Sequence, residues 1–116
     1  MLNQLVVTGR LTKDPELRKT DTGRNVTTIT LAVPRSYKNS NGEYDTDFID
    51  CTLWSNVAEI TTEYRHKGDL LGVRGRIQTR MIEKEEEKAR QVTEVIGERV
   101  TFLSSGHKTK AKEKEE

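Results

Sequence analysis

Cysteine, aromatic residues, long apolar runs and net charge are all scarce in this 116-residue sequence. The single cysteine, Cys51, has no partner for an intramolecular disulfide, and no apolar signal segment follows Met1, so we expect a reducing, cytoplasmic setting. No run approaches the ~18 apolar residues of a membrane helix, and we expect no membrane partner. Lys and Arg number 20 against 19 Asp and Glu, a net charge of +1. A nucleic-acid site must therefore arise from the distribution of charge rather than from its sum.

Residues that support catalysis or bind metals are also few. The chain has two histidines and one cysteine, which do not provide the usual four ligands of a zinc site. Asp45 and Asp47 would face away from Asp50 on a regular strand, and the turn before them lacks the spacing of a calcium-binding loop. No Gly-rich phosphate loop leads from a strand into a helix. We predict a protein that is not an enzyme and has no metal site and no cofactor.

The apolar pattern has period two over most of the chain, which indicates half-buried strands. Asn41-Gly42 is typical of a tight hairpin turn between the second and third strands. Thr22-Gly23 and Lys13-Asp14-Pro15 are breaks before the second strand. Five strands are expected, at Asn3–Lys13, Val26–Ser36, Thr46–Trp54, Asp69–Arg80 and Gln91–Leu103.

One segment has helical spacing instead. Val57, Ile60 and Tyr64 predict a helix that reaches Lys67, with Asn56 as its N-terminal cap. Gly68 is placed to end it. Five strands with a short helix between the third and fourth are the arrangement of an OB-fold barrel. We therefore predict an all-β, five-stranded OB-fold barrel.

Two segments are expected to lie outside the barrel. Pro34 cannot donate a hydrogen bond to a ladder, so Arg35–Lys38 is predicted to leave the barrel as a loop. Glu83–Arg90 is rich in Glu and Lys, and it is expected to be a solvated loop or a protruding hairpin.

The end of the chain changes character after Leu103. Ser104-Ser105-Gly106 is typical of a flexible hinge, and Lys108–Glu116 alternates Lys and Glu without an apolar anchor. We predict one domain over residues 1–104 and a disordered charged tail over residues 105–116.

The fourth expected strand separates apolar from basic residues by parity. Leu71, Val73, Gly75 and Ile77 share one face, which suits a core. Arg74, Arg76 and Arg80 share the other and would form a basic stripe about 20 Å long at ~3.3 Å per residue. The alternative is an ordinary solvated face on which the arginines pair with neighbouring acids.

The third expected strand places aromatic rings outward. If Ile49, Cys51 and Leu53 face the core, Phe48 and Trp54 face solvent. An exposed ring is a stacking platform for an unpaired base, worth ~1–3 kcal/mol per base with any sequence. The alternative is that these rings pack under the helix or in a subunit interface.

Weaker signals surround this face. Arg35 and Tyr37 together provide one phosphate contact and one stacking ring, although an ordinary hairpin end has the same composition. Arg10 and Lys13, at the end of the first strand, would extend the basic surface.

Five pieces of the sequence, in order, resemble the bacterial-type single-stranded DNA-binding proteins of replication and recombination. They are VVTGRLTKDPELR at Val6–Arg18, TLAVPRSYKNSNGE at Thr30–Glu43, DFIDCTLWSNVAE at Asp47–Glu59, KGDLLGVRGRIQTR at Lys67–Arg80 and TEVIGERVTFL at Thr93–Leu103. The similarity spans about residues 1–104.

This resemblance implies an OB fold, usually assembled as a homotetramer, with single-stranded DNA wrapped around it. It places the base-stacking positions of the family on Tyr37, Phe48 and Trp54. The phosphate contacts that it implies are Arg10, Lys13, Arg35, Arg74, Arg76 and Arg80.

The chain departs from the family pattern in two places. The family commonly has another aromatic residue after the fourth strand, where this chain has Met81-Ile82, so one stacking ring is missing. The family's main member also ends in an acidic, Phe-ended tip that recruits repair and replication proteins. This chain ends in KAKEKEE, so recruitment through such a tip is not expected. A shorter paralogue of the competence, plasmid or phage type fits better than the housekeeping protein.

These patterns predict a protein that binds single-stranded DNA without sequence preference and protects it during replication, recombination or repair, at the nucleoid. The alternative is an OB-fold protein-interaction module, such as a primosome accessory protein, whose aromatic face docks protein. The near-zero net charge and the missing ring favour that alternative.

Overall fold

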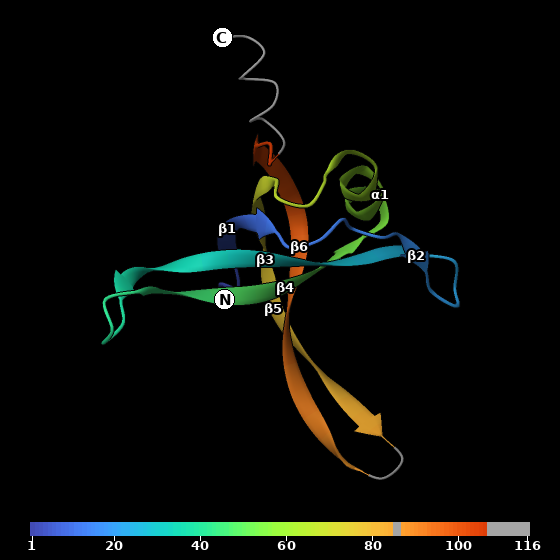
Figure 1. Cartoon of the computed structure of the whole chain (residues 1–116). Helices are drawn as coiled ribbons and strands as arrows, with labels where there is room; N and C mark the ends of the chain where they lie inside the picture. The colour runs from blue at the N-terminus through green and yellow to red at the C-terminus, as the bar shows by residue number, and fades with distance from the viewer. Residues whose placement is uncertain (85–86, 107–116) are drawn as a thin grey trace, which may run out of the picture.

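The computed structural model describes residues 1–84 and 87–106, which form six strands and one helix (Figure 1). In chain order they are β1 (Leu5–Leu11), β2 (Arg18–Lys19), β3 (Asn25–Lys38), β4 (Tyr44–Trp54), α1 (Ser55–Tyr64), β5 (Leu70–Lys84) and β6 (Glu87–Ser104). The five long strands correspond to the five predicted strands. The two-residue β2, which pairs with the start of β3, was not predicted. Within the described ranges, no helix is long and apolar enough to cross a membrane.

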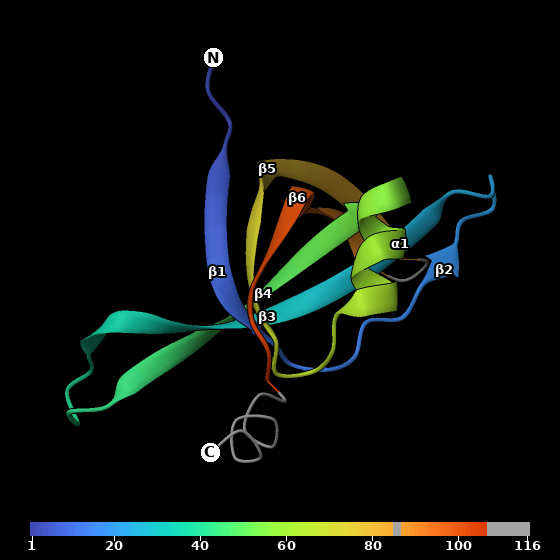
Figure 2. The same cartoon turned by 90° about the horizontal axis from the view of Figure 1, so that it is seen from above.

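The strands close into a barrel because β1 pairs on two sides. The sheet order is β1-β5-β6-β4-β3-β2, and β1 also pairs with β3 through Arg10 and Leu11. Most neighbours are antiparallel, but β4 and β6 run parallel where Cys51–Leu53 meets Val95–Gly97. Helix α1 lies between β4 and β5 in the chain and beside the strands in space (Figure 2). The predicted OB-fold barrel is therefore confirmed.

The inner faces of the strands form one core. Its fully enclosed members are Leu11, Ile29, Leu31, Cys51, Leu53, Ala58, Leu71 and Val73. Ala58 comes from α1, which therefore covers one part of the barrel. Burial, together with the nearby Asp50 charge, raises the pKa of the Cys51 thiol to about 11, so this cysteine stays neutral. The predicted inward parity of Ile49, Cys51 and Leu53 is confirmed.

The helix begins and ends earlier than predicted. The chain passes directly from β4 into α1 through Ser55, whose φ is +55°, so Asn56 lies inside the helix instead of capping it. No side chain caps the N-terminus. The helix ends at Tyr64, and Gly68 instead occupies the turn that leads into β5.

Two hairpins extend beyond the barrel as arms (Figures 1 and 2). In the β3–β4 arm (residues 34–46), Pro34 still pairs with Thr46, and the ladder shifts register before it resumes at Lys38 and Tyr44. Arg35–Lys38 leaves the barrel as predicted, but it does so as strand, so the loop prediction was wrong. The turn at Asn41-Gly42 is confirmed, with Gly42 at φ +79°.

The β5–β6 arm (residues 77–84 and 87–95) corrects a second expectation. Its ladder continues to Ile82 and Arg90, so the hairpin alternative for Glu83–Arg90 is right. Ile77, predicted to be core, is 44% exposed. It has the core parity, but the ladder of β1 with β5 ends at Gly75, and Ile77 lies beyond it.

A buried carboxylate holds the end of the described chain. Asp69 accepts hydrogen bonds from the backbone N–H of His66 at 2.8 Å and of Gly106 at 3.0 Å. The chain is therefore attached to the body as far as Gly106, two residues past the predicted domain boundary. The predicted disordered tail lies, from His107 on, outside the described residues.

A β-bulge between β5 and β6 requires glycine at position 75. Arg74 pairs with Arg99 and Gly75 with Gly97, so β6 carries one extra residue there. A Cβ on Gly75 would lie 2.0 Å from the carbonyl oxygen of Ile96, whereas a Cβ on Gly72 would make only ordinary contacts at 3.7 and 3.8 Å. Gly72 and Gly75 lie on the same strand, so Gly72 is a matched control for substitutions at Gly75.

We expect Gly75→Ala to lower the free energy of unfolding by about 1–3 kcal/mol, because the backbone of Ile96 must move to admit the methyl group. Gly72→Ala is expected to stay within about 0.5 kcal/mol of the parent. Urea denaturation of both variants measures the difference. Equal midpoints for the two variants would show that the close approach at Gly75 does not constrain the fold.

Candidate nucleic-acid interface

The outer face of β3 and β4 carries the predicted rings. Phe48 lies opposite Ala32 in the ladder and is 66% exposed. Trp54 lies on the same face, six residues along β4, and is half-buried. Between them Asp50 accepts a hydrogen bond from the hydroxyl of Thr30 at 2.5 Å. The outward parity of both rings is therefore confirmed, although Trp54 is less exposed than we expected.

Trp54 lies in a groove that four other strands complete. The groove is lined by Arg18, Val26, Thr28, Thr52, Trp54, Gln78, Arg80 and Glu94. Arg80 and Gln78 come from β5 and Glu94 from β6, and β6 lies between β5 and β4 in the sheet. The fold thus brings Arg80 to the same groove as Trp54. Arg24 covers the Trp54 ring, since its guanidinium lies 4.3 Å from the centroid of that ring.

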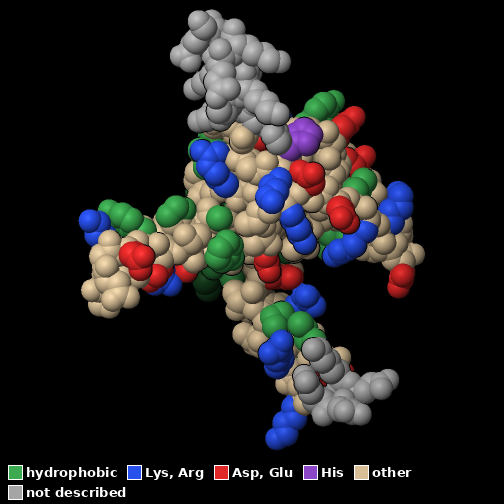
Figure 3. Space-filling model, viewed as in Figure 1, with side chains coloured by type: hydrophobic (Ala, Val, Ile, Leu, Met, Phe, Trp, Pro, Cys, Tyr) green, Lys and Arg blue, Asp and Glu red, His purple; other side chains and the backbone are tan. Residues whose placement is uncertain are grey.

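Basic and acidic side chains are interspersed on the face that Figure 3 shows. Two arginines of the predicted basic stripe have acidic partners. Arg80 Nε lies 3.1 Å from Glu94 and Arg76 Nε lies 3.5 Å from Glu98. Arg76 also donates to Gln78, which in turn donates to Glu94. Two of the three arginines therefore match the solvated, acid-paired alternative, while they still share a face with Trp54. Arg74 is exposed, and no described acid pairs with it.

Arg10 and Lys13 lie beside this face. Arg10 donates to the carbonyl of Gly68 at 2.8 Å, and it lines a hollow with Ala32, the ladder partner of Phe48. Lys13 lines a hollow that shares Arg18 and Thr28 with the Trp54 groove. Their predicted phosphate contacts stay predictions.

The β3–β4 arm carries Arg35 and Tyr37. Arg35 binds Asp47 through two hydrogen bonds, Nε to Oδ2 at 3.1 Å and NH2 to Oδ1 at 2.9 Å. The hydrogen bond and the charge of Asp47 raise the pKa of the Arg35 guanidinium. Tyr37 is 63% exposed. A DNA phosphate at Arg35 would therefore compete with an existing carboxylate.

Sequence reasoning missed two residues of this surface. Tyr44 has the same parity as Phe48 on β4 and is 56% exposed, with the ammonium of Lys38 5.8 Å from its ring centroid. Extending the period-two pattern by two steps would have found it. Arg24 follows the turn between β2 and β3, and no local pattern indicates that it reaches Trp54.

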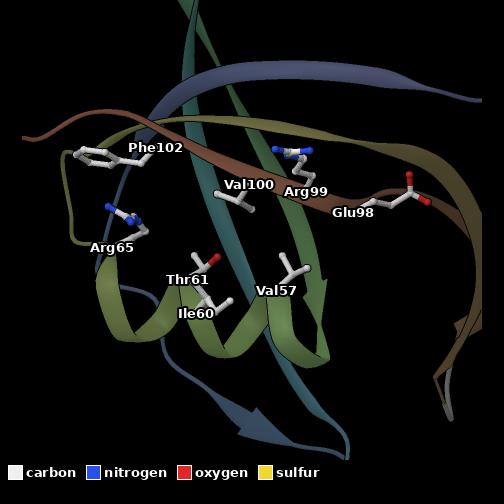
Figure 4. A pocket seen from close by; sticks show the side chains of 8 residues that line it. All are labelled: Val57, Ile60, Thr61, Arg65, Glu98, Arg99, Val100 and Phe102. Atoms are coloured by element: carbon white, nitrogen blue, oxygen red, sulfur yellow. The ribbon is translucent and has the colours of Figure 1, made fainter.

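A separate pocket lies between α1 and β6 (Figure 4). Val57, Ile60 and Thr61 of the helix face Val100 of the strand, and Arg65 stacks on Phe102 at 4.2 Å. None of the predicted DNA-contacting residues lines it.

The comparisons with known proteins agree with this geometry. The model of the Single-strand binding protein family matches residues 2–103. This chain belongs to that family. The match covers every strand that carries the outer face, apart from the last residue of β6.

Similar relatives in this single-strand binding family come from several bacteria. "Single-stranded DNA-binding protein B" of Bacillus subtilis is 50% identical over 111 residues, which are 96% of this chain and 98% of that protein. "Single-stranded DNA-binding protein 3" of Listeria innocua is 50% identical over 105 residues, 90% of this chain and 66% of that protein. "Single-stranded DNA-binding protein" of Enterococcus faecalis has the same identity and length of match, which is 56% of that protein. The chain thus spans about two thirds of the Listeria protein and little more than half of the Enterococcus protein.

The ion pair in the β3–β4 arm gives a titration test. The hydrogen bond from Arg35 and its positive charge outweigh partial burial and hold the pKa of Asp47 below its ordinary value. We expect Arg35→Ala to raise the pKa of Asp47 toward that value, because the charged carboxylate loses its partner. Carboxyl NMR titration measures the shift, with Arg10→Ala as the control. An unchanged Asp47 titration in Arg35→Ala would show that the pair does not form in solution.

Proposed function

We propose that this chain binds single-stranded DNA without sequence preference, by stacking bases on Phe48 and Trp54 and contacting phosphates through Arg76 and Arg80. One observation carries the proposal: two outward aromatic rings share a face with these arginines. Stacking tolerates any sequence because every base has a π-face. The relatives are named as single-stranded DNA-binding proteins, which supports single-stranded DNA as the ligand.

The arrangement favours single strands over duplex. Only an unpaired base offers its flat face to a ring, whereas a duplex offers mainly phosphates to an interface. Arg76 and Arg80 already have carboxylate partners, so a binding mode that depends on charge alone gains little here. The rings therefore give single strands their advantage.

We also propose the finer properties that the resemblance implies. The chain would act as a non-enzymatic homotetramer that coats strands during replication, recombination or repair. β1 offers a strand edge for assembly, because it pairs with β5 from Leu5 to Arg10 but with β3 only through Arg10 and Leu11.

The alternative of a protein-docking module has one surface that fits it. Half of the residues that line the pocket between α1 and β6 are apolar, and two of these, Ile60 and Phe102, are exposed. If the protein were only such a module and did not bind DNA, adding DNA would leave the fluorescence of Trp54 unchanged.

The proposal predicts that oligo-dT quenches Trp54, the only tryptophan in the chain. Phe48→Ala should weaken binding by ~1–3 kcal/mol, because one stacking ring is lost. It should keep the parent's melting temperature, because the ring is 66% exposed. Fluorescence titration at two salt concentrations measures the quenching and the affinity, and thermal unfolding measures the melting temperature. No quenching, or tighter binding to duplex than to single strands, would rule out the proposal.

Tyr44 is expected to act as a further stacking ring that extends the DNA path along the β3–β4 arm. Tyr44→Ala should weaken binding of long oligo-dT by ~1–3 kcal/mol. Tyr64 on α1 is also 56% exposed, so Tyr64→Ala is a control matched in residue type and exposure. Labelled-oligonucleotide anisotropy compares the two variants. Equal affinities would remove Tyr44 from the DNA path.

A further inference from the structure

We propose that Arg24 and Glu94 occupy the Trp54 groove as stand-ins for a base and a phosphate, and that single-stranded DNA enters this groove by displacing both. The inference rests on the proposed function. It adds two residues that set affinity, and neither belongs to the predicted DNA-contacting set.

Arg24 takes the place of a base. Its guanidinium lies 4.3 Å from the centroid of the Trp54 ring, and a planar guanidinium stacks on an aromatic face as a base does. Among the described residues, no acid holds Arg24, so the ring is the partner of its charged group. The ring that is to stack a base is therefore already covered.

Hydrogen bonds hold the backbone of Arg24, whereas its guanidinium contacts the Trp54 ring. Thr20 and Arg24 exchange hydrogen bonds across the turn, at 2.9 Å between Thr20 N and Arg24 O and 3.2 Å between Arg24 N and Thr20 Oγ1. Lys19 and Asn25 pair next to this turn. A displaced Arg24 side chain thus stays tethered beside the groove, where it can contact a phosphate.

Glu94 takes the place of a phosphate. Its Oε2 accepts from Arg80 Nε at 3.1 Å and its Oε1 accepts from Gln78 Nε2 at 3.0 Å. These are the donors that two oxygens of a phosphate would use. Only 20% of the Glu94 side chain is exposed, so its carboxylate fills that part of the groove. Burial acts to raise the pKa of Glu94, but the hydrogen bonds from Gln78 and Arg80 outweigh it, and the carboxyl stays ionised at neutral pH.

The interaction free energies favour replacement of Arg24 and Glu94 by DNA over a groove that stays closed. Arg80, the partner of Glu94, is 56% exposed, so solvent screens this ion pair. A cation–π contact or an ion pair at such a site is worth a factor of about two to five in an equilibrium constant. Stacking of one base is worth about five- to 150-fold. A strand therefore displaces Arg24 and Glu94, and each displacement lowers its apparent affinity by about two- to fivefold.

The first test removes the carboxylate charge. Glu94→Gln should bind labelled oligo-dT about two- to fivefold more tightly at low salt, and the gain should shrink as salt screens the pair. The control is Glu59→Gln on α1, which makes the same charge change on an exposed residue of the helix. Unchanged or weaker binding by Glu94→Gln, or an equal gain in the control, overturns the role of Glu94.

The second test removes the guanidinium. Arg24→Ala should change the fluorescence of Trp54 in the free protein, and at high salt it should bind oligo-dT about two- to fivefold more tightly than the parent. Lys19→Ala removes the same charge from the neighbouring strand, and it should leave the free fluorescence unchanged and only weaken binding. If Arg24→Ala behaves like Lys19→Ala at every salt concentration, Arg24 does not cover the ring.

The two failures are distinguishable. If the parent protein does not bind oligo-dT, the proposed function and this inference fall together. If the parent binds oligo-dT while Glu94→Gln and Arg24→Ala behave like their controls, the proposed function is kept. The proposal that DNA displaces Arg24 and Glu94 is then rejected. Circular dichroism of each variant verifies that the barrel is folded.

Discussion

Pairing of β1 with both β5 and β3 closes the barrel, and closure fixes the two sides of every long strand. One set of alternate residues must fill the interior, and the other set must face outward. On β4 this rule places Cys51 and Leu53 in the core and Phe48 and Trp54 outside. Arg80, Gln78 and Glu94 lie in the β5–β6 arm beyond the barrel, and the β5–β6 register brings them to the groove of Trp54. The outward position of Phe48 and Trp54, on the proposed DNA-binding surface, therefore follows from how the core is enclosed.

Several arginines of the outer face are paired locally with acids. Asp47, Glu94 and Glu98 each lie within 3.5 Å of an arginine on the same surface. Three unpaired guanidiniums on one strand would repel one another, and the carboxylates remove that repulsion while they hold the side chains in place. Pairing in this way explains how a chain of net charge +1 presents several arginines to a polyanion.

Sequence reasoning succeeded where the period-two pattern is strict. Phe48 and Trp54 were placed on the outer face because β4 has no bulge between them. Ile77 and Arg35–Lys38 were misplaced because the pattern shows parity but not where a strand leaves the barrel or where a ladder shifts. The partners of Arg80 and Trp54 were invisible for another reason. Glu94 meets Arg80 only through the β5–β6 register, and Arg24 meets Trp54 only through the β2–β3 turn.

Local pairing also decides how the face divides its affinity between charge and stacking. Each phosphate that binds Arg76 or Arg80 must replace an ion pair, so the net gain per phosphate is small. A base that stacks on the exposed Phe48 ring displaces only water, and salt does not screen that contact. Aromatic stacking therefore contributes a larger share of the binding free energy than it would on a face of free arginines. This balance suits the proposed binding of unpaired strands of any sequence.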